Sequence, residues 1–130
     1  MSVLVKNLGN GVKNIIINDK KTYNSLSFAT LKSLLNTFKK LDKDNGTKVI
    51  ILEGAGKGFS AGHNLKEVKN LKKRSKYLKL FNLCSKLMLQ IVEGRKPVIA
   101  KVHGAAYAAG CQLATSCDLA YSTKDATFAT

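Results

Sequence analysis

The amino-acid sequence predicts a protein of the α/β class, because apolar runs of strand length alternate with stretches that have helical periodicity. The order is a hairpin followed by three helices, with a strand after each helix. With 130 residues, of which 45% are hydrophobic, the chain can form one domain with a packed core. The sequence shows neither a repeat of fixed period nor a low-complexity segment.

The chain is expected to begin with an antiparallel hairpin. Two apolar runs, residues 3–8 and 12–17, are separated by Gly9-Asn10-Gly11. An Asn-Gly pair favours the positive backbone angles that a tight hairpin turn requires. Residues 18–24 are polar and predict a loop.

A long amphipathic helix is expected at about residues 27–43. Ser27 or Ser25 can cap its first turn, and Asn45-Gly46 marks its end. Its apolar side chains recur at helical spacing and form one stripe: Leu31, Leu34, Leu35, Phe38 and Leu41. A short buried strand follows at residues 48–53.

The middle of the chain predicts a second long helix at about residues 75–93, preceded at 65–73 by a short helix or a mobile segment. The apolar stripe of the long helix is interpreted as core packing and contains Tyr77, Leu80, Phe81, Cys84, Leu87, Met88 and Ile91. Gly94 ends this helix, and Pro97 leads into a strand at residues 98–102.

The last part of the chain completes the alternation of helices and strands. A third helix is expected at about residues 108–116, and a short strand at 119–122. Residues 127–130 predict a further strand that is cut within the element.

Two segments of small residues each follow an apolar strand, at residues 54–66 and 103–112. Small residues let a backbone approach a ligand closely and direct bare N–H groups at it. The pair of segments therefore predicts a binding site built from main-chain donors.

The net charge of +14 admits a nucleic-acid partner. Only Arg74 and Arg95 are arginines, however, and arginine binds phosphates and base edges in a bidentate way that lysine does not match. Lysines are scattered over most of the chain, as AT-rich coding bias would also produce. One dense cluster of basic residues forms either a solvated helical face or a surface that attracts a phosphate-bearing ligand. It consists of Lys66, Lys69, Lys72, Lys73, Arg74, Lys76 and Lys79.

The three cysteines, Cys84, Cys111 and Cys117, have no metal-ligand spacing and are odd in number, so reduced thiols and no metal site are expected. No apolar run has the length needed to span a bilayer, and the first residues lack the order of a signal peptide. These observations predict a cytoplasmic protein without a membrane partner, and the mitochondrial matrix is the alternative.

Four motifs follow one another along nearly the whole chain: Asn24-Ser25-Leu26, residues 49–54 with 58–66, residues 96–100, and residues 104–118. In this order they resemble the N-terminal half of the enoyl-CoA hydratase/isomerase (crotonase) superfamily. Each motif alone is weak, and their combination is specific. The variant at residues 59–65, together with 108–113 and 116–118, is typical of one branch of that superfamily.

The resemblance implies a crotonase (ClpP-like) fold, a spiral of ββα units. Residues 1–130 would form the N-terminal part of a single crotonase-like domain whose C-terminal part is absent, as in a truncated or partial reading frame. Apolar surface and a sheet edge would then be left uncovered. Full-length family members form trimers, which is not expected of this shorter chain.

The resemblance also implies that the protein binds an acyl-CoA thioester in fatty acid metabolism. Its oxyanion hole would consist of the backbone N–H groups of His63 and Ala109. Two such donors can stabilise a developing enolate by about 3–4 kcal/mol each. Ala109 also begins a predicted helix, where the dipole favours negative charge. Coenzyme A would be held by Lys21 (or Lys20), Ala61, Asn64 and Leu65, and because it is part of the substrate no separate cofactor is expected.

The chain departs from the family where protons are transferred. Hydratases of this family use two glutamates, and the first falls at Gln112, whose amide orients water but does not accept its proton at neutral pH. The second lies beyond Thr130. His63 replaces a smaller residue and is expected to act through its N–H, although its side chain is a possible base. Asp118 and His103 are expected to be structural, with no visible partner for His103.

Three functions are therefore open at this point. The first is an enoyl-CoA hydratase/isomerase-like enzyme, a lyase of the crotonase type. The second is a non-catalytic acyl-CoA-binding homologue, which Gln112 favours. The third is an RNA-binding protein, which the shortage of arginine and of exposed aromatic residues disfavours.

Overall fold

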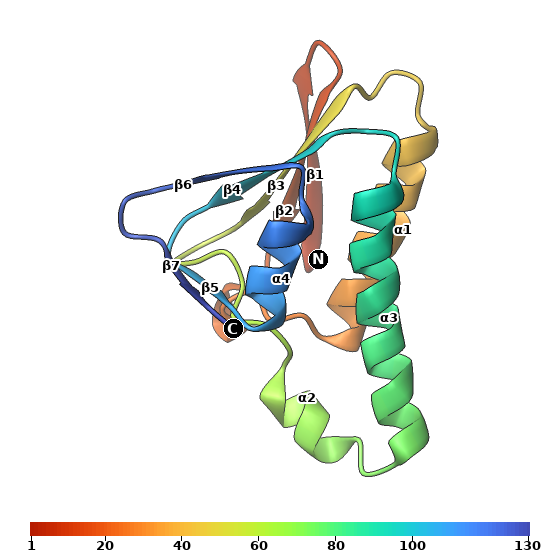
Figure 1. The fold of residues 1–130 in the computed structure, drawn as a ribbon, viewed down its shortest axis with the longest axis vertical. Helices are drawn as coiled ribbons and strands as arrows, with labels where there is room; N and C mark the ends of the chain where they lie inside the picture. The colour runs from red at the N-terminus through yellow and green to blue at the C-terminus, as the bar shows by residue number, and fades with distance from the viewer.

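The computed structural model describes residues 1–130 and contains a five-stranded sheet with helices packed against it (Figure 1). The strands of this sheet lie in the order β1 (Val3–Gly9), β2 (Val12–Ile17), β3 (Val49–Gly54), β4 (Val98–Val102) and β6 (Leu119–Ser122). The hairpin strands β1 and β2 are antiparallel, and all other neighbours are parallel. A second, two-stranded parallel sheet pairs β5 (Ala105–Tyr107) with β7 (Thr127–Ala129).

Four α-helices connect these strands: α1 (Phe28–Lys43), α2 (Leu65–Asn70), α3 (Arg74–Glu93) and α4 (Ala109–Ser116). A single 3₁₀ turn, η1 (Lys20–Thr22), precedes α1. Helices α1 and α3 pack against each other, and α4 contacts α3 together with strands β4 and β6. The predicted alternation of strands and helices is therefore confirmed, including the short helix α2. No helix is both long and apolar enough to cross a membrane.

Helix α1 begins and ends where its sequence predicts. The side chain of Ser27 caps it by accepting a hydrogen bond from the N–H of Thr30 at 3.2 Å. Lys40 and Lys43 stand in the last turn, where positive charge complements the helix dipole. Its predicted apolar stripe is buried in full: Leu31, Leu34, Leu35, Phe38 and Leu41.

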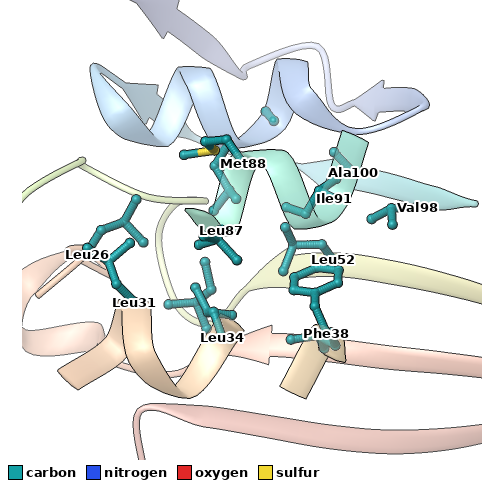
Figure 2. Close-up of a cluster of buried hydrophobic side chains, with 14 of the residues drawn as sticks. Leu26, Leu31, Leu34, Phe38, Leu52, Leu87, Met88, Ile91, Val98 and Ala100 are labelled. Carbon is teal, nitrogen blue, oxygen red and sulfur yellow. The ribbon is translucent and has the colours of Figure 1, made fainter. Parts of the chain in front are cut away.

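The core lies between the sheet and the helices α1 and α3. Figure 2 shows that side chains of α1, β3, α3 and β4 point toward one another there. Leu34, Leu52 and Leu87, from three of these elements, are fully buried. Burying a side chain of this size contributes about 1.5–3 kcal/mol, which is why the stripes of α1 and α3 hold the helices onto the sheet.

The predicted core stripe of α3 is wrong at Phe81 and at Tyr77, which is only half-buried and lies outside the core. Leu80, Cys84, Leu87, Met88 and Ile91 are buried, whereas Phe81 is 44% exposed. The N-terminal half of α3 extends toward α2 (Figure 1), and the ring of Phe81 lies there against the rings of His63 and Tyr77 instead of in the core. The expected uncovered apolar surface is present on the edge strand β6, at Leu119 and Tyr121, and on β7, at Phe128, all about half exposed.

Candidate functional site

The two small-residue segments meet in the structure. The first connects β3 to α2, and the second connects β4 to α4. The N–H groups of Phe59 and Ser60 donate to the carbonyl of Ala105 at 3.0 and 3.1 Å, and the N–H of Tyr107 donates to the carbonyl of Ser60 at 3.0 Å. Strand β5, which the sequence analysis did not predict, is the piece of the second segment that makes these bonds.

Glycines let the two segments approach this closely. Gly62 has φ +89°, and a Cβ atom there would stand 2.9 Å from the carbonyl oxygen of Tyr107 and 3.3 Å from the nitrogen of Ala109. A Cβ atom on Gly110 would overlap the carbonyl oxygen of Ser60. Only glycine therefore fits at these two positions without displacing the facing segment.

Two backbone donors at the junction are free. The N–H of His63, directly after Gly62, and the N–H of Ala109 donate to no protein acceptor. Ala109 is the first residue of α4, so its N–H points out of the helix at the positive end of the dipole. Two unpaired N–H groups at one junction can bind a single oxygen that carries negative charge.

The residue before α4 has an unusual backbone conformation. Ala108 has φ 49° and ψ −119°, a region that residues with a side chain rarely adopt. Its N–H donates to Ala129 of β7 at 2.8 Å, and its carbonyl accepts from the N–H of Gln112 at 3.0 Å. These bonds hold a sharp bend that starts α4 immediately beside Gly62.

Asn24 belongs to the first of the family motifs, and the sequence predicts no role for it. Its fully buried side chain donates to the carbonyls of Ala55 and Gly58, at 2.7 and 2.9 Å, and accepts from the N–H of Asp19 at 2.9 Å. The hydroxyl of Ser60 in turn donates to the Asn24 carbonyl at 2.8 Å. Asn24 therefore ties the first segment to the loop before α1.

The residues predicted to hold coenzyme A surround one hollow of about 310 Å³. Its lining consists of Lys21, Thr22, Ser25, Ala61, His63, Asn64, Leu65 and Lys66. The alternative lysine, Lys20, instead has its stem beside Gly56. The Asn64 side chain is engaged as the cap of α2, because it accepts the N–H of Glu67 at 3.2 Å. Binding of coenzyme A by these residues stays a prediction.

Gln112 lines a separate hollow of about 500 Å³ together with Ala108, Cys111, Thr115 and Thr130. Its side chain is exposed and forms no hydrogen bond, and it lies one helical turn after Ala109. The amide is therefore close to the Ala109 donor along the chain and open to a ligand or water.

His103 has a partner that the sequence did not reveal. Its Nε2 atom lies 2.7 Å from the carbonyl oxygen of Gly56 and donates to it, which corrects the expectation of no partner. Asp118 accepts the N–H of Val98 at 2.7 Å, so it joins the chain after α4 to β4. Both side chains hold backbone segments in place.

The cysteines form no disulfide, and the surroundings of two of them favour the neutral thiol. Burial, with a smaller effect of the Asp118 charge, raises the pKa of the Cys117 thiol to about 12, and burial also raises the pKa of Cys84. No group of three or more His, Cys, Asp or Glu side chains could hold a metal ion.

Comparison with known proteins gives one consistent result. Residues 7–130 match the enoyl-CoA hydratase/isomerase family. Over 120 residues the chain is 43% identical to human mitochondrial enoyl-CoA hydratase domain-containing protein 3, covering 92% of this chain and 40% of that protein. The rat protein of the same name is 39% identical, with the same coverage of both chains. These relatives belong to the branch of which the motif variant at residues 59–65, 108–113 and 116–118 is typical.

Solved structures agree with the sequence comparison. The crystal structure of a Mycobacterium smegmatis enoyl-CoA hydratase superposes with a TM-score of 0.97 at 42% identity, covering 100% of this chain and 51% of that chain. The structure of the human domain-containing protein 3 gives a TM-score of 0.95 at 41% identity, with the same coverage. The chain spans about 40% of the length of the curated relatives named here. It belongs to the enoyl-CoA hydratase/isomerase (crotonase) family and has the predicted crotonase fold over residues 1–130.

Proposed function

We propose that this protein binds the thioester of an acyl-CoA and polarises its carbonyl group through the backbone N–H groups of His63 and Ala109. The observation that carries the proposal is the contact of Gly62 with Ala109, which brings two N–H groups without protein acceptors to one junction. The family and the names of its members support a CoA thioester as the ligand.

The two donors would act on charge that develops during reaction. When a proton leaves the carbon beside a thioester carbonyl, or when water adds to an enoyl thioester, negative charge accumulates on the carbonyl oxygen. Fixed donors aimed at that oxygen stabilise the enolate by about 3–4 kcal/mol each. The dipole of α4 at Ala109 adds to this effect.

The charged part of coenzyme A would lie in the hollow beside the first segment. Lys21 and Lys66 line it and are exposed, so they can meet phosphate groups. The nearby basic cluster on α2 and α3 forms no ion pair, since Arg95 with Asp42 and Lys101 with Glu53 are the ion pairs of this structure. Unpaired positive charge raises the rate at which an anionic ligand is captured. This function requires no cofactor besides the CoA of the substrate.

Proton transfer separates two candidate functions. Gln112 can orient a water molecule or a carbonyl, but its amide does not take up a proton at neutral pH. An enoyl-CoA hydratase or isomerase of fatty acid metabolism would therefore need a base other than Gln112, either the side chain of His63 or a carboxylate outside residues 1–130. A non-catalytic acyl-CoA-binding homologue needs none, and the free, exposed amide of Gln112 favours this second candidate.

The test uses protein expressed from its complete reading frame. Calorimetry with crotonyl-CoA measures binding, and loss of the enoyl absorbance measures hydration, in the wild type and in Gln112→Glu. The matched control is Gln90→Glu, the same change on α3 outside both hollows of the site. Binding with hydration only in Gln112→Glu supports the non-catalytic homologue, and hydration by the wild type supports the enzyme. Absence of crotonyl-CoA binding contradicts both.

The location of the protein in the cell is a related proposal. The relatives of human and rat are named mitochondrial, which supports the mitochondrial matrix, the alternative from sequence, over the cytoplasm. A fluorescent fusion of the complete reading frame that labels mitochondria would support it, and a diffuse cytoplasmic signal would contradict it.

A further inference from the structure

Two buried side-chain polar atoms have no hydrogen-bond partner in this structure, Oδ1 of Asn14 and Nδ1 of His63. Asn14 is in the hairpin strand β2, far along the chain from the site, whereas His63 carries one of the two free backbone donors. Buried polar atoms are almost always paired, so an unpaired one at a candidate site needs a physical explanation.

An aromatic stack from α3 holds the imidazole ring of His63. The ring of Phe81 meets it edge to face, with centroids 5.3 Å apart and planes at 75°. Tyr77, one turn earlier on α3, stacks on Phe81 with centroids 6.5 Å apart and planes at 20°. Phe81 is apolar yet 44% exposed, and it is not part of the hydrophobic core. Its aromatic contacts are with the rings of His63 and Tyr77.

The buried Nδ1 atom restricts the protonation state of His63. A proton on Nδ1 would place an N–H donor where neither water nor an acceptor reaches it. The tautomer with its proton on Nε2 avoids this cost and leaves only an unpaired acceptor at Nδ1, which buried sites tolerate more often than an unpaired donor. Nε2 itself is neither buried nor hydrogen-bonded, so it is open to a ligand.

We propose that Phe81, supported by Tyr77, is a positioning residue that holds His63 as the neutral Nε2–H tautomer and thereby orders the loop whose backbone N–H forms half of the oxyanion hole. This inference rests on the proposed function, because it names acyl-CoA as the ligand of that loop. A loop that is already ordered loses less conformational freedom when the thioester binds. The Nε2–H group would then offer a side-chain donor to a ligand in the hollow that His63 lines.

The first measurement needs no ligand. Ring ¹⁵N NMR of His63 is recorded in the protein from its complete reading frame, for the wild type, Phe81→Leu, Tyr77→Leu and Leu89→Ala, and residues 1–130 contain only one other histidine, His103. Leu89 is the control because it lies on the same helix and is 53% exposed. We expect an unprotonated Nδ1 and a protonated Nε2 in the wild type and in Leu89→Ala. Phe81→Leu should mix the two tautomers, and Tyr77→Leu should do so less.

The second measurement follows the ¹³C signal of a labelled thioester carbonyl on binding. Loss of the aromatic contact should weaken binding in Phe81→Leu by about threefold to tenfold and reduce the downfield shift of the carbonyl, while Leu89→Ala matches the wild type. A protonated Nδ1 in the wild type, or wild-type spectra in Phe81→Leu, would overturn the inference and leave the proposed function intact. A wild-type protein with the expected tautomer but no acyl-CoA binding would overturn the proposed function instead.

Discussion

Gly62 lies against Ala109 so closely that a Cβ atom on the glycine would stand 3.3 Å from the alanine nitrogen. This contact joins the loop after β3 to the start of α4, two segments that are more than forty residues apart in the chain. The candidate oxyanion hole exists only because both partners lack a bulky side chain there.

Replacing Gly62 by alanine tests this contact. The variant Gly62→Ala should lose about 1–3 kcal/mol more stability than Gly9→Ala, because the new methyl group must push the second segment away. Gly9 is the matched control, since it has φ +85° against +89° for Gly62 and open space around its Cβ position. Urea denaturation measures the free energy of unfolding of both variants. Equal losses would show that the two segments separate without cost.

The strained backbone of Ala108 predicts opposite effects at two neighbouring positions. Ala108→Gly should leave the free energy of unfolding unchanged or raise it by about 1 kcal/mol, because glycine adopts φ 49° and ψ −119° without the steric cost that alanine bears. Ala109→Gly, in the first position of α4, should lower it by up to about 1 kcal/mol. Thermal and urea denaturation decide the signs, and equal destabilisation by both changes would contradict the strain.

Asn24 should be the most sensitive polar residue of the site. Asn24→Ala leaves the carbonyls of Ala55 and Gly58 without donors and should cost about 3 kcal/mol or more of folding free energy. Asn24→Asp keeps the shape but turns two donors into acceptors, so it should cost at least as much at neutral pH. The control is Asn82→Ala on the exposed face of α3, which should stay within about 0.5 kcal/mol of the wild type. If both Asn24 changes have only a small effect on the free energy of unfolding, Asn24 does not hold the first segment to the loop before α1.

The turn between α1 and β3 predicts a pH-dependent stability. The hydroxyl of Thr47 donates to Asp44 at 2.6 Å, and this bond is the main cause that lowers the pKa of the carboxyl below its model-compound value of 3.8. A carboxyl with a lowered pKa stabilises the fold above its unfolded pKa, and this contribution is lost as the pH falls through the folded pKa. The stability difference between wild type and Thr47→Val should therefore be larger at pH 7 than at pH 3.

Thr37→Val is the control for this pH effect. The Thr37 hydroxyl donates to the carbonyl of Ser33 at 2.8 Å, so its bond involves no titrating group. Its contribution to the free energy of unfolding should be the same at both pH values. If Thr47→Val also shows no change with pH, the hydrogen bond does not shift the titration of Asp44.

Most helices and strands follow from local sequence. Ser27 and the stripe from Leu31 to Leu41 predict α1 because a cap and a periodicity depend only on residues a few positions apart. Strand β5 was not predicted, because Ala105 and Ala106 have no strand preference. The hydrogen bonds of this strand go to β7 and to Ser60, which are distant in sequence.

The sequence by itself determined the fold class, the family motifs and the residues proposed for the site, because these depend on local periodicity and on the order of short motifs. Only the tertiary structure decided what surrounds them. It showed the contact of Gly62 with Ala109, the buried bonds of Asn24 and the packing of Phe81 on His63. Each of these joins segments that no local pattern relates, since contacts of this kind arise only when the whole chain packs around one core.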